Sequence, residues 1–585
     1  MPTTISLCMI VRNEAAALPR TLAAARPWVD ELVVVDTGST DATPEIARAY
    51  GARVVHWTWR DDFAAARNES LRHATGAWIL VLDADEVLAD GAGPALRAAC
   101  EGAPADVVAY EIKIVCPRDG DAGLVRLNWF PRLFRNLPGV RFEGVIHEQV
   151  VGSLVGRGRI ARADVEVLHS GYTLTPEQMQ AKARRNAALL ERQLRDEPDY
   201  APGWFQLAET YVLLGRLDEG IDAYRRCLRL LDSSRLTLSP GVIAVALQNL
   251  GAALLARGDR EEGLRTIRAA LAVDPDLAPA YVHLGNCAMA DGDWPAAERH
   301  FAAALAAATR AGDRGEYQIS PWLIHYLHGC TQARLGKHAE ALASFEAALA
   351  IHPEHAESLW LMALTAGHVG AWGRSLAALD RLRALGRDDF AARAQRAQAL
   401  TELGRHEEAT EAARAALALE PDAAPMVALV AENLARQGRY ADAVAWYTRL
   451  AALVPESAAP WLALAQCHER LGDGAAMMAA YERAVRLAPD APPVLFALGS
   501  ACLRGGALDT AEACLGAAVA ADPERAEYRL TYALCRLKRG AVAEARRLLD
   551  DVLARWPDLP QAREARRLAA RLETLGARVA GAPAS

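Results

Sequence analysis

The chain has 585 residues, 52% of them hydrophobic, and this length is too great for a single hydrophobic core. We therefore expect two or more folded domains. The 65 basic and 73 acidic residues give a net charge of −8 without a basic block, which argues against a nucleic-acid partner. The ten cysteines show no CxxC pair and no regular spacing, so we expect reduced thiols in a cytoplasmic protein.

Residues 1 to about 175 alternate short apolar runs with amphipathic segments. The apolar runs predict strands at 5–11, 31–36, 53–57, 78–83 and 107–115. Helical patterns lie between the earlier runs, at 15–26, 42–50, 62–75 and 90–101. This βαβα order predicts a mostly parallel sheet covered by helices. The first run is far too short to cross a bilayer and lacks a basic flank, so we expect neither a transmembrane segment nor a signal peptide there.

Two of the predicted strands end at carboxylates. One run leads into Asp36, and another leads into Asp83, Asp85 and Glu86. In open α/β sheets, ligands bind at the carboxyl ends of the strands. Two such ends can converge on one metal-dependent site, because carboxylates are common ligands of Mg²⁺. The alternative for each aspartate is a helix N-cap, a position that Asp favours.

From about residue 200 the sequence changes to Ala, Leu and Arg at helical spacing and repeats every 34 residues. Prolines recur at this step from Pro421 to Pro557, and glycines recur at 336, 370, 404, 438, 472, 506 and 540. Upstream, Gly258 and Gly292 are again 34 apart, although the steps on either side of this pair are nine and ten residues longer. Such a period, with a turn glycine and a terminal proline, is typical of tetratricopeptide repeats of two helices each. We count ten repeats.

These patterns divide the chain into four parts. We expect an α/β domain at 1–175, a connecting helix at 176–199, about ten tetratricopeptide repeats at 200–557, and a capping helix with a tail at 558–585. The connecting segment is expected to pack the two halves together. Superhelical repeat surfaces bind extended chains, which favours a protein or peptide partner.

Four segments of the first 175 residues resemble family 2 glycosyltransferases of the GT-A fold, in the family's order and spacing. Residues 5–14 and 35–41 are similar to its first two strands and the loops that hold the nucleotide, and 63–68 resembles its "ARN" segment. Residues 82–86 resemble its DxD motif. The resemblance implies a Rossmann-like GT-A domain, a nucleotide-diphosphate sugar as donor, with UDP-sugar expected, and inversion at the anomeric carbon.

The same resemblance implies roles for individual residues. Asp85 is expected to bind Mg²⁺ or Mn²⁺, and Asp83 to contact the metal or the ribose. Asp36 and Glu14 lie in the two segments that hold the nucleotide, and Arg67 is placed to meet phosphate charge. A divalent cation acts as a Lewis acid for the departing diphosphate.

Segments 128–135 and 142–148 resemble a subgroup that includes lipopolysaccharide-core glucosyltransferases and bacteriocin S-glycosyltransferases with appended repeats. In that subgroup they build the acceptor side. The acceptor hydroxyl or thiol must lose a proton, and Glu148 is the expected catalytic base. A salt bridge from Glu148 to Arg132 or Arg135 is the alternative.

His147 or His169 is expected to complete the metal shell, with a hydrogen-bonded structural histidine as the alternative. The sequence thus favours a glycosyltransferase whose repeats recruit a protein, peptide or glycan acceptor. Two alternatives stay open: a transferase that builds lipopolysaccharide or capsule glycan, and a repeat scaffold that binds a sugar nucleotide without turning it over.

Overall fold

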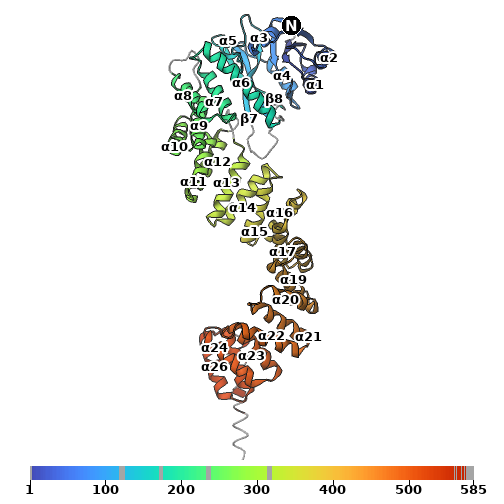
Figure 1. The fold of residues 1–585 in the computed structure, drawn as a ribbon, viewed down its shortest axis with the longest axis vertical. Coiled ribbons are helices and arrows are strands. Elements are labelled where there is room, and N and C mark those ends of the chain that lie inside the picture. Colours follow the sequence, from blue (N-terminus) through green and yellow to red (C-terminus); the bar gives the residue numbers. More distant parts are fainter. Residues whose placement is uncertain are drawn as a thin grey trace, which may run out of the picture. The chain divides into compact units, whose positions relative to one another are not determined.

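The computed structural model describes residues 3–116, 126–169, 175–231, 239–311 and 319–558, with further positions between 560 and 574. The chain forms two compact units, residues 1–361 and 362–585 (Figure 1). The first unit contains an α/β domain, a connecting helix and the repeats up to residue 361. The second unit contains the later repeats.

The described part of the α/β domain has eight strands. They are β1 (Ile5–Val11), β2 (Glu31–Asp36), β3 (Arg53–His56), β4 (Trp78–Val81), β5 (Glu86–Leu88), β6 (Val107–Cys116), β7 (Arg126–Arg135) and β8 (Arg159–His169). Its helices are α1 (Leu18–Ala25), the 3-10 helix η1 (Arg26–Trp28), α2 (Thr43–Ala49), α3 (Phe63–His73), α4 (Ala92–Glu101) and α5 (Val151–Leu154). All five predicted strands and all four predicted helices of this domain are present.

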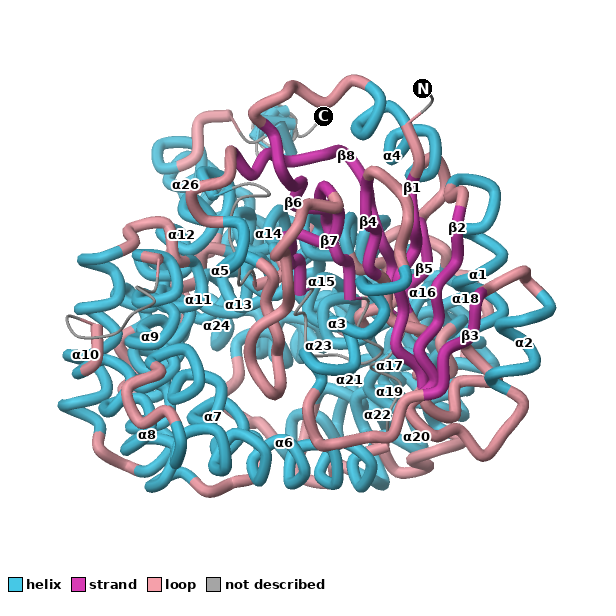
Figure 2. The backbone as a smooth tube through the Cα atoms, turned by 90° about the horizontal axis from the view of Figure 1, so that it is seen from above, coloured by secondary structure: helices cyan, strands magenta, loops and turns pink. Residues whose placement is uncertain are grey.

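The eight strands form one mixed sheet, drawn in magenta in Figure 2. Their order is β3-β2-β1-β4-β7-β6-β8-β5. Strands β3, β2, β1 and β4 are parallel to one another. Strand β7 runs antiparallel to both β4 and β6, β8 runs parallel to β6, and β5 runs antiparallel to β8. The prediction of a mostly parallel sheet therefore describes the half formed by the first four strands, and antiparallel pairing completes the sheet.

Strands β5, β7 and β8 were not predicted. The sequence of β8 is RIARADVEVLH, in which buried and exposed residues alternate, so it contains no apolar run. Strand β7 contains three arginines and a proline in ten residues. Half-exposed strands carry a polar face, whereas strands covered on both faces are apolar throughout.

Strand β1 shows why the first four strands were readable. Its residues Ile5, Leu7 and Met9 pack in one apolar cluster with Leu18 of α1 and with residues of α4. Cys8, which points to the opposite face, belongs to a second cluster that includes residues of α3. Both faces are covered, and the parallel strands therefore end at one edge where the following loops are free to carry polar side chains.

Helix α6 (Pro176–Asp196) follows the α/β domain where the connecting helix is expected. Thr175 caps it, because its hydroxyl accepts the Gln178 N–H while the Gln178 side chain accepts the Thr175 N–H. Leu190 of α6 shares one apolar cluster with Phe205 of the first repeat and with Ile146 from a loop of the α/β domain. The connection is therefore packed rather than flexible.

Twenty helices follow in the described residues between 201 and 555. They are α7 (Ala201–Leu213), α8 (Leu217–Arg229), α9 (Pro240–Arg257), α10 (Arg260–Val273), α11 (Ala278–Ala290), α12 (Trp294–Ala311), α13 (Pro321–Arg334), α14 (His338–Ile351), α15 (Ala356–His368), α16 (Trp372–Ala384), α17 (Phe390–Glu402), α18 (His406–Leu417), α19 (Ala424–Arg436), α20 (Tyr440–Leu453), α21 (Ala459–Leu471), α22 (Gly474–Leu487), α23 (Pro492–Gly505), α24 (Leu508–Ala521), α25 (Ala526–Lys538) and α26 (Val542–Arg555). The boundary between the two compact units falls inside α15. The capping helix expected at 558–585 lies largely outside the described residues, and its described positions are helical.

The glycines of the 34-residue period lie in the turns between the two helices of each successive pair. All ten have positive φ, from 71° at Gly370 to 104° at Gly258. A side chain at such a φ strains the backbone, which makes glycine the favoured residue at the end of a helix. At each of these ten positions an added Cβ would meet nothing within 4 Å, so the constraint comes from the backbone and not from space. The 34-residue glycine period therefore follows from the backbone conformation of these turns.

Helix α9 is the one described helix that is long and apolar enough to cross a membrane by length and composition. Such a match is weak evidence, since core helices of soluble proteins pass the same test. Its residues Ala244, Val245 and Leu250 are buried in the apolar cluster of the first repeats. This packing is that of a solenoid helix.

Candidate functional site

The DxD segment lies between β4 and β5 and is held from inside the protein. Glu86 Oε2 accepts the Asp83 N–H at 2.8 Å, and Asp83 O accepts the Glu86 N–H at 3.0 Å. The Thr21 hydroxyl donates to the Ala84 carbonyl at 2.7 Å. Glu86 and Thr21 are buried, so the backbone of the segment is fixed while Asp83 and Asp85 line a cleft.

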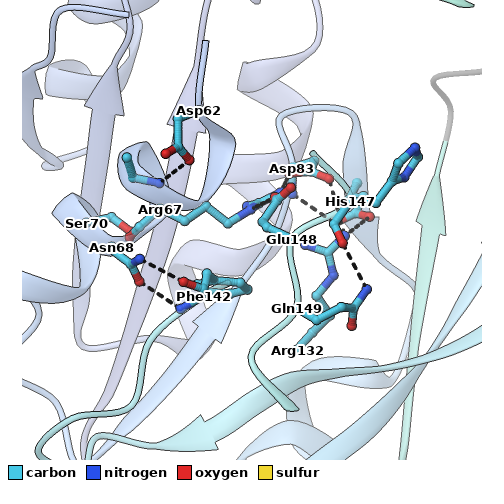
Figure 3. Close-up of polar contacts among 12 residues, drawn as sticks. Asp62, Arg67, Asn68, Ser70, Asp83, Arg132, Phe142, His147, Glu148 and Gln149 are labelled. Atoms are coloured by element: carbon cyan, nitrogen blue, oxygen red, sulfur yellow. Dashed lines mark hydrogen bonds and ion pairs between the residues drawn. The ribbon is translucent and has the colours of Figure 1, made fainter. Parts of the chain in front are cut away.

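Arg67, near the start of α3, is a buried link between this segment and a second loop. Its Nη2 donates to Asp83 Oδ1 at 2.6 Å, and its Nε donates to Glu148 Oε1 (Figure 3). Burial alone would lower the pKa of Arg67, but Asp83 and Glu148 more than reverse this and raise it. Burial likewise raises the pKa of Asp83, and Arg67 with Arg132 outweighs that effect and holds the pKa well below its usual range.

Arg132 of β7 completes the ion-pair network beneath the cleft. Its Nη2 donates to Asp83 Oδ2 and to Glu86 Oε1, each at 3.3 Å. Glu86 is 2% exposed, and this burial raises the pKa of its carboxyl although Arg132 opposes the rise. Both oxygens of Asp83 are therefore engaged by arginines.

Glu148 forms a salt bridge, which was the alternative to a base role, but with a different arginine from the two considered. Its partner is Arg67 rather than Arg132 or Arg135. Arg135 donates instead to the Val107 carbonyl at 2.8 Å. The network could not be read from the sequence, because it depends on β7 lying antiparallel beside β4 and on where loop 142–149 returns to α3.

Asn68 anchors the loop that carries Glu148. Its Nδ2 donates to the Phe142 carbonyl at 2.9 Å, and its Oδ1 accepts the Phe142 N–H at 2.8 Å (Figure 3). The two ends of the loop are joined, because Glu143 and Gln149 exchange two backbone hydrogen bonds, each at 2.9 Å. Sequence reasoning assigned no role to Asn68, although it lies in the "ARN" segment beside Arg67. Its two bonds make it a positioning residue for Glu148.

Asp85 and His169 meet where β8 ends. Strands β5 and β8 pair with Glu86 opposite His169, and this register brings His169 Nε2 within 3.1 Å of Asp85 Oδ2. A carboxylate oxygen and an imidazole nitrogen are suitable ligands for a divalent cation such as Mn²⁺. Among the residues that the structure describes, no group of three or more His, Cys, Asp and Glu side chains is arranged to hold a metal ion. A cation held by these two side chains would need its remaining ligands from a bound substrate.

His147 is placed differently from His169. It lies next to Glu148 in loop 142–149, and its φ of +53° is uncommon for a residue other than glycine. Figure 3 shows its ring turned away from the contact between Arg67 and Asp83. It nevertheless lines the same cleft.

Glu14 lies in the loop after β1, and Asp36 is the last residue of β2. Glu14 lines the cleft, and burial together with the charge of Asp85 raises the pKa of its carboxyl. Asp36 is 3% exposed, accepts the Ser39 N–H at 3.0 Å and lies 3.1 Å from His56 Nδ1. Asp36 thus shapes its own loop, whereas Thr37 is the residue of this loop that lines the cleft.

The cleft has a volume of about 1270 Å³ and extends beyond the α/β domain. One part of its wall comes from the loops after β1 and β4 and from loop 142–149. The opposing part comes from the connecting helix and the first repeats: Gln178, Lys182 and Arg185 of α6, Phe205, Gln206 and Glu209 of α7, and Val242 of α9. Sequence reasoning missed this wall, since nothing in the helical pattern shows which face of α6 turns toward the sheet.

Both the α/β domain and the repeats match models of known protein families. Residues 6–159 match the glycosyl transferase family 2 model. Tetratricopeptide repeat models match residues 201–230, 276–354, 390–423, 458–501 and 496–560.

A tetratricopeptide repeat-containing protein of Synechococcus elongatus is 43% identical over 204 residues, which cover 34% of this chain and 49% of that protein. The SPbeta prophage-derived glycosyltransferase SunS of Bacillus subtilis is 27% identical over 230 residues, which cover 38% of this chain and 53% of SunS. The chain thus covers about half the length of each relative.

Among solved structures, YrrB, described as a tetratricopeptide repeat protein with an unusual peptide-binding site, matches 32% of this chain and 97% of its own at 19% identity and a TM-score of 0.28. Together with the mixed sheet and the ten helix pairs of the described chain, the family matches show that a glycosyl transferase family 2 domain is joined here to tetratricopeptide repeats.

Proposed function

We propose that the chain is an inverting, metal-dependent glycosyltransferase that moves a sugar from a nucleotide-diphosphate donor, with UDP-sugar expected, to an acceptor recruited by the repeats. The observation that carries this proposal is the cleft in which the Asp85–His169 pair lies beside the chain of contacts from Asp83 through Arg67 to Glu148. The family 2 match supports a nucleotide sugar as the donor.

Asp85 and His169 are the proposed ligands of Mg²⁺ or Mn²⁺, with Asp83 beside them. When bound there, the cation would supply Lewis-acid stabilisation of the departing diphosphate. Burial and the charge of Asp85 raise the pKa of the Glu14 carboxyl, so Glu14 lies in the same acidic part of the cleft as the DxD segment.

Arg67 is proposed to meet the phosphate charge of the donor. Its Nη2 and Nε are taken by carboxylates, but its Nη1 is buried and makes no hydrogen bond within the described residues. A buried N–H without an acceptor is costly, and a phosphate oxygen would satisfy it. Asp36 is proposed to contribute to nucleotide binding by holding the loop that presents Thr37 to the cleft.

Glu148 is the proposed catalytic base. It lines the cleft, and its Oε1 takes the bond from Arg67 while its Oε2 makes no hydrogen bond in the part of the chain that the structure describes. That second oxygen can accept the proton of an acceptor hydroxyl or thiol. Arg67 and Asn68 support this role, because they fix the carboxylate and its loop.

The repeats are proposed to deliver a protein or peptide acceptor. Phe205, Gln206 and Glu209 of α7 line the cleft directly, so a chain bound along the first repeats would reach the site without crossing open solvent. The Gln206 Oε1 is buried and has no hydrogen-bond partner among the described residues, which offers an acceptor for a backbone N–H.

A screen of sugar nucleotides tests the function. The purified chain is incubated with UDP-, GDP-, dTDP- and ADP-sugars, with Mn²⁺ or with a chelator, and sugar-nucleotide hydrolysis is measured beside Asp85→Ala. Asp90→Ala is the matched control, because Asp90 is exposed and lies outside the cleft lining. We expect Mn²⁺-dependent turnover of one donor, at least about a hundredfold lower in Asp85→Ala and unchanged in Asp90→Ala. Binding of a donor without any turnover would support the scaffold alternative, and no binding at millimolar concentration would overturn the proposal.

A further inference from the structure

Helix α6 presents a polar stripe to the cleft. Gln178, Lys182 and Arg185 are spaced by four and three residues, so they lie on one face of the helix, and all three line the cleft. Farther along α6, Leu190 packs into the apolar cluster that contains Ile146. This packing fixes the orientation of the stripe relative to the active-site loop.

The cations of this stripe have no carboxylate partner. Within the described residues, neither Lys182 nor Arg185 forms an ion pair, and the side-chain hydrogen bond of Arg185 goes to the neutral Asn186 at 3.2 Å. By contrast, Arg192 of the same helix pairs with Asp61. Lys182 and Arg185 therefore differ from Arg192, because they face the cleft without an ion pair among the described residues.

A third cation faces the same space. Arg12, in the loop after β1, lines the cleft and forms no ion pair with any described residue. It lies close enough to Arg185 that burial and the charge of Arg12 together lower the pKa of the Arg185 guanidinium. Arg185 also stands over the Phe63 ring, 5.7 Å from its centroid. Like charges that face one cleft repel one another, and an anion bound between them relieves this repulsion.

The position of Lys182 indicates which anion this is. Its charge acts on Glu14, which in turn lies close enough to Asp85 and Asp83 to feel their charges. Arg12 and Glu14 lie two residues apart in the loop after β1, so Lys182 and Arg185 both face this loop, and the DxD segment lines the same cleft. An anion that contacts both cations and also a metal ion held by the DxD segment must carry more than one negative charge.

We propose that Lys182 and Arg185 of α6 bind the diphosphate of the nucleotide donor, so that the helix leading into the repeats forms one wall of the donor site. This inference rests on the proposed function. Lys and Arg form charge-assisted hydrogen bonds with phosphate oxygens, and these bonds strengthen as negative charge gathers on the leaving diphosphate. The α/β domain supplies the carboxylate wall, and α6 supplies the cationic wall.

The test measures the affinity of the full chain for the nucleoside diphosphate that matches the preferred donor, by calorimetry with Mn²⁺ and with chelator. Lys182→Ala and Arg185→Ala are each expected to weaken binding about tenfold, and the double variant about a hundredfold. The affinity of the double variant should also fall less steeply with added salt, a readout that a merely structural change would not alter. Arg184→Ala is the matched control: Arg184 is exposed on the same helix, lies outside the cleft lining, and should leave the affinity unchanged.

Three outcomes would overturn the inference. Equal affinity in the chain and in the double variant would show that these cations serve another anion, such as an acidic group of the acceptor. An equal loss in Arg184→Ala would show that general helix charge, and not this stripe, is responsible. If the unaltered chain binds none of UDP, GDP, dTDP and ADP, the proposed function itself fails, and this result is distinguishable because it precedes any substitution.

Discussion

In the α/β domain, Arg67 and Arg132 lie beneath the surface between carboxylates of different strands and loops. In the repeats, Arg405 and Arg439 pair with carboxylates one helical turn away, and both partners of each pair are about half exposed. The buried ion pairs of the α/β domain hold distant segments in one position, whereas the exposed ion pairs of the repeats contribute little to stability. Arginine therefore belongs to a buried network at the candidate site in the α/β domain and to a solvent-exposed helix face in the repeats.

Removing Arg67 gives the largest expected effect. Arg67→Met leaves the Asp83 and Glu148 carboxylates without the buried cation between them, which should cost about 3–5 kcal/mol of the unfolding free energy of the α/β domain. Transfer activity should fall at least about a hundredfold, because the DxD segment and the proposed base lose their shared anchor. Denaturant unfolding and a donor-hydrolysis assay measure the two effects. Arg405→Met is the control from the repeats, and an unchanged stability in both variants would contradict the comparison.

Asn68→Ala should give the next largest effect. It removes both hydrogen bonds to Phe142, with an expected loss of about 1–3 kcal/mol in unfolding free energy and a fall of about tenfold or more in kcat. Asn136→Ala is the matched control, because Asn136 also bonds backbone carbonyls, those of Ala74 and Gly76, but lies outside the cleft lining. The positioning role predicts that both variants lose stability and only Asn68→Ala loses kcat. An equal loss of kcat in Asn68→Ala and Asn136→Ala would show that Asn68 has only a structural role.

The pH dependence of stability should separate the two regions more finely. Because Arg67 and Arg132 hold the pKa of Asp83 below its unfolded value of about 3.9, the stabilisation from Asp83 is complete above that pH and is lost progressively below it. The stability gap between the unaltered chain and Asp83→Asn should therefore be full at pH 7 and narrow as the pH falls below about 4. Denaturant titrations at several pH values measure it. A gap that stays constant at low pH would show that Asp83 gains nothing from its arginines.

The smallest effect concerns two neighbouring glycines of one repeat. Gly472 ends α21 with φ of +75°, so Gly472→Ala should destabilise the second unit by about 1–2 kcal/mol. Gly474 begins α22 with room for a Cβ, so Gly474→Ala should be neutral or stabilise by less than about 1 kcal/mol. The unfolding midpoint of that unit distinguishes the two. Equal effects would show that the period does not record turn geometry.

How much the sequence revealed follows from the same physics. The repeats were countable because every turn requires a positive φ, and the strands from Ile5 and Glu31 were placed because both faces of the sheet are covered. Strands β7 and β8 carry polar faces and were not predicted. The contact of Arg132 with Asp83 and the register that brings His169 to Asp85 were therefore not predicted either. The structure therefore brings all of the candidate residues except Asp36 to one cleft, whereas their mutual contacts depend on pairings between distant strands.

Loop 142–149 is anchored on two sides. Asn68 bonds it to the α/β domain, and Ile146 lies in the same apolar cluster as α6 and the first repeat. A catalytic fragment cut at residue 175 would expose that apolar surface and release the segment that carries Glu148. The smallest transplantable module is thus longer than the family match at residues 6–159, because it includes α6 and the first repeat. The same cluster continues into α9 and α10, so a splice between related chains should lie beyond these helices and not at the end of the sheet.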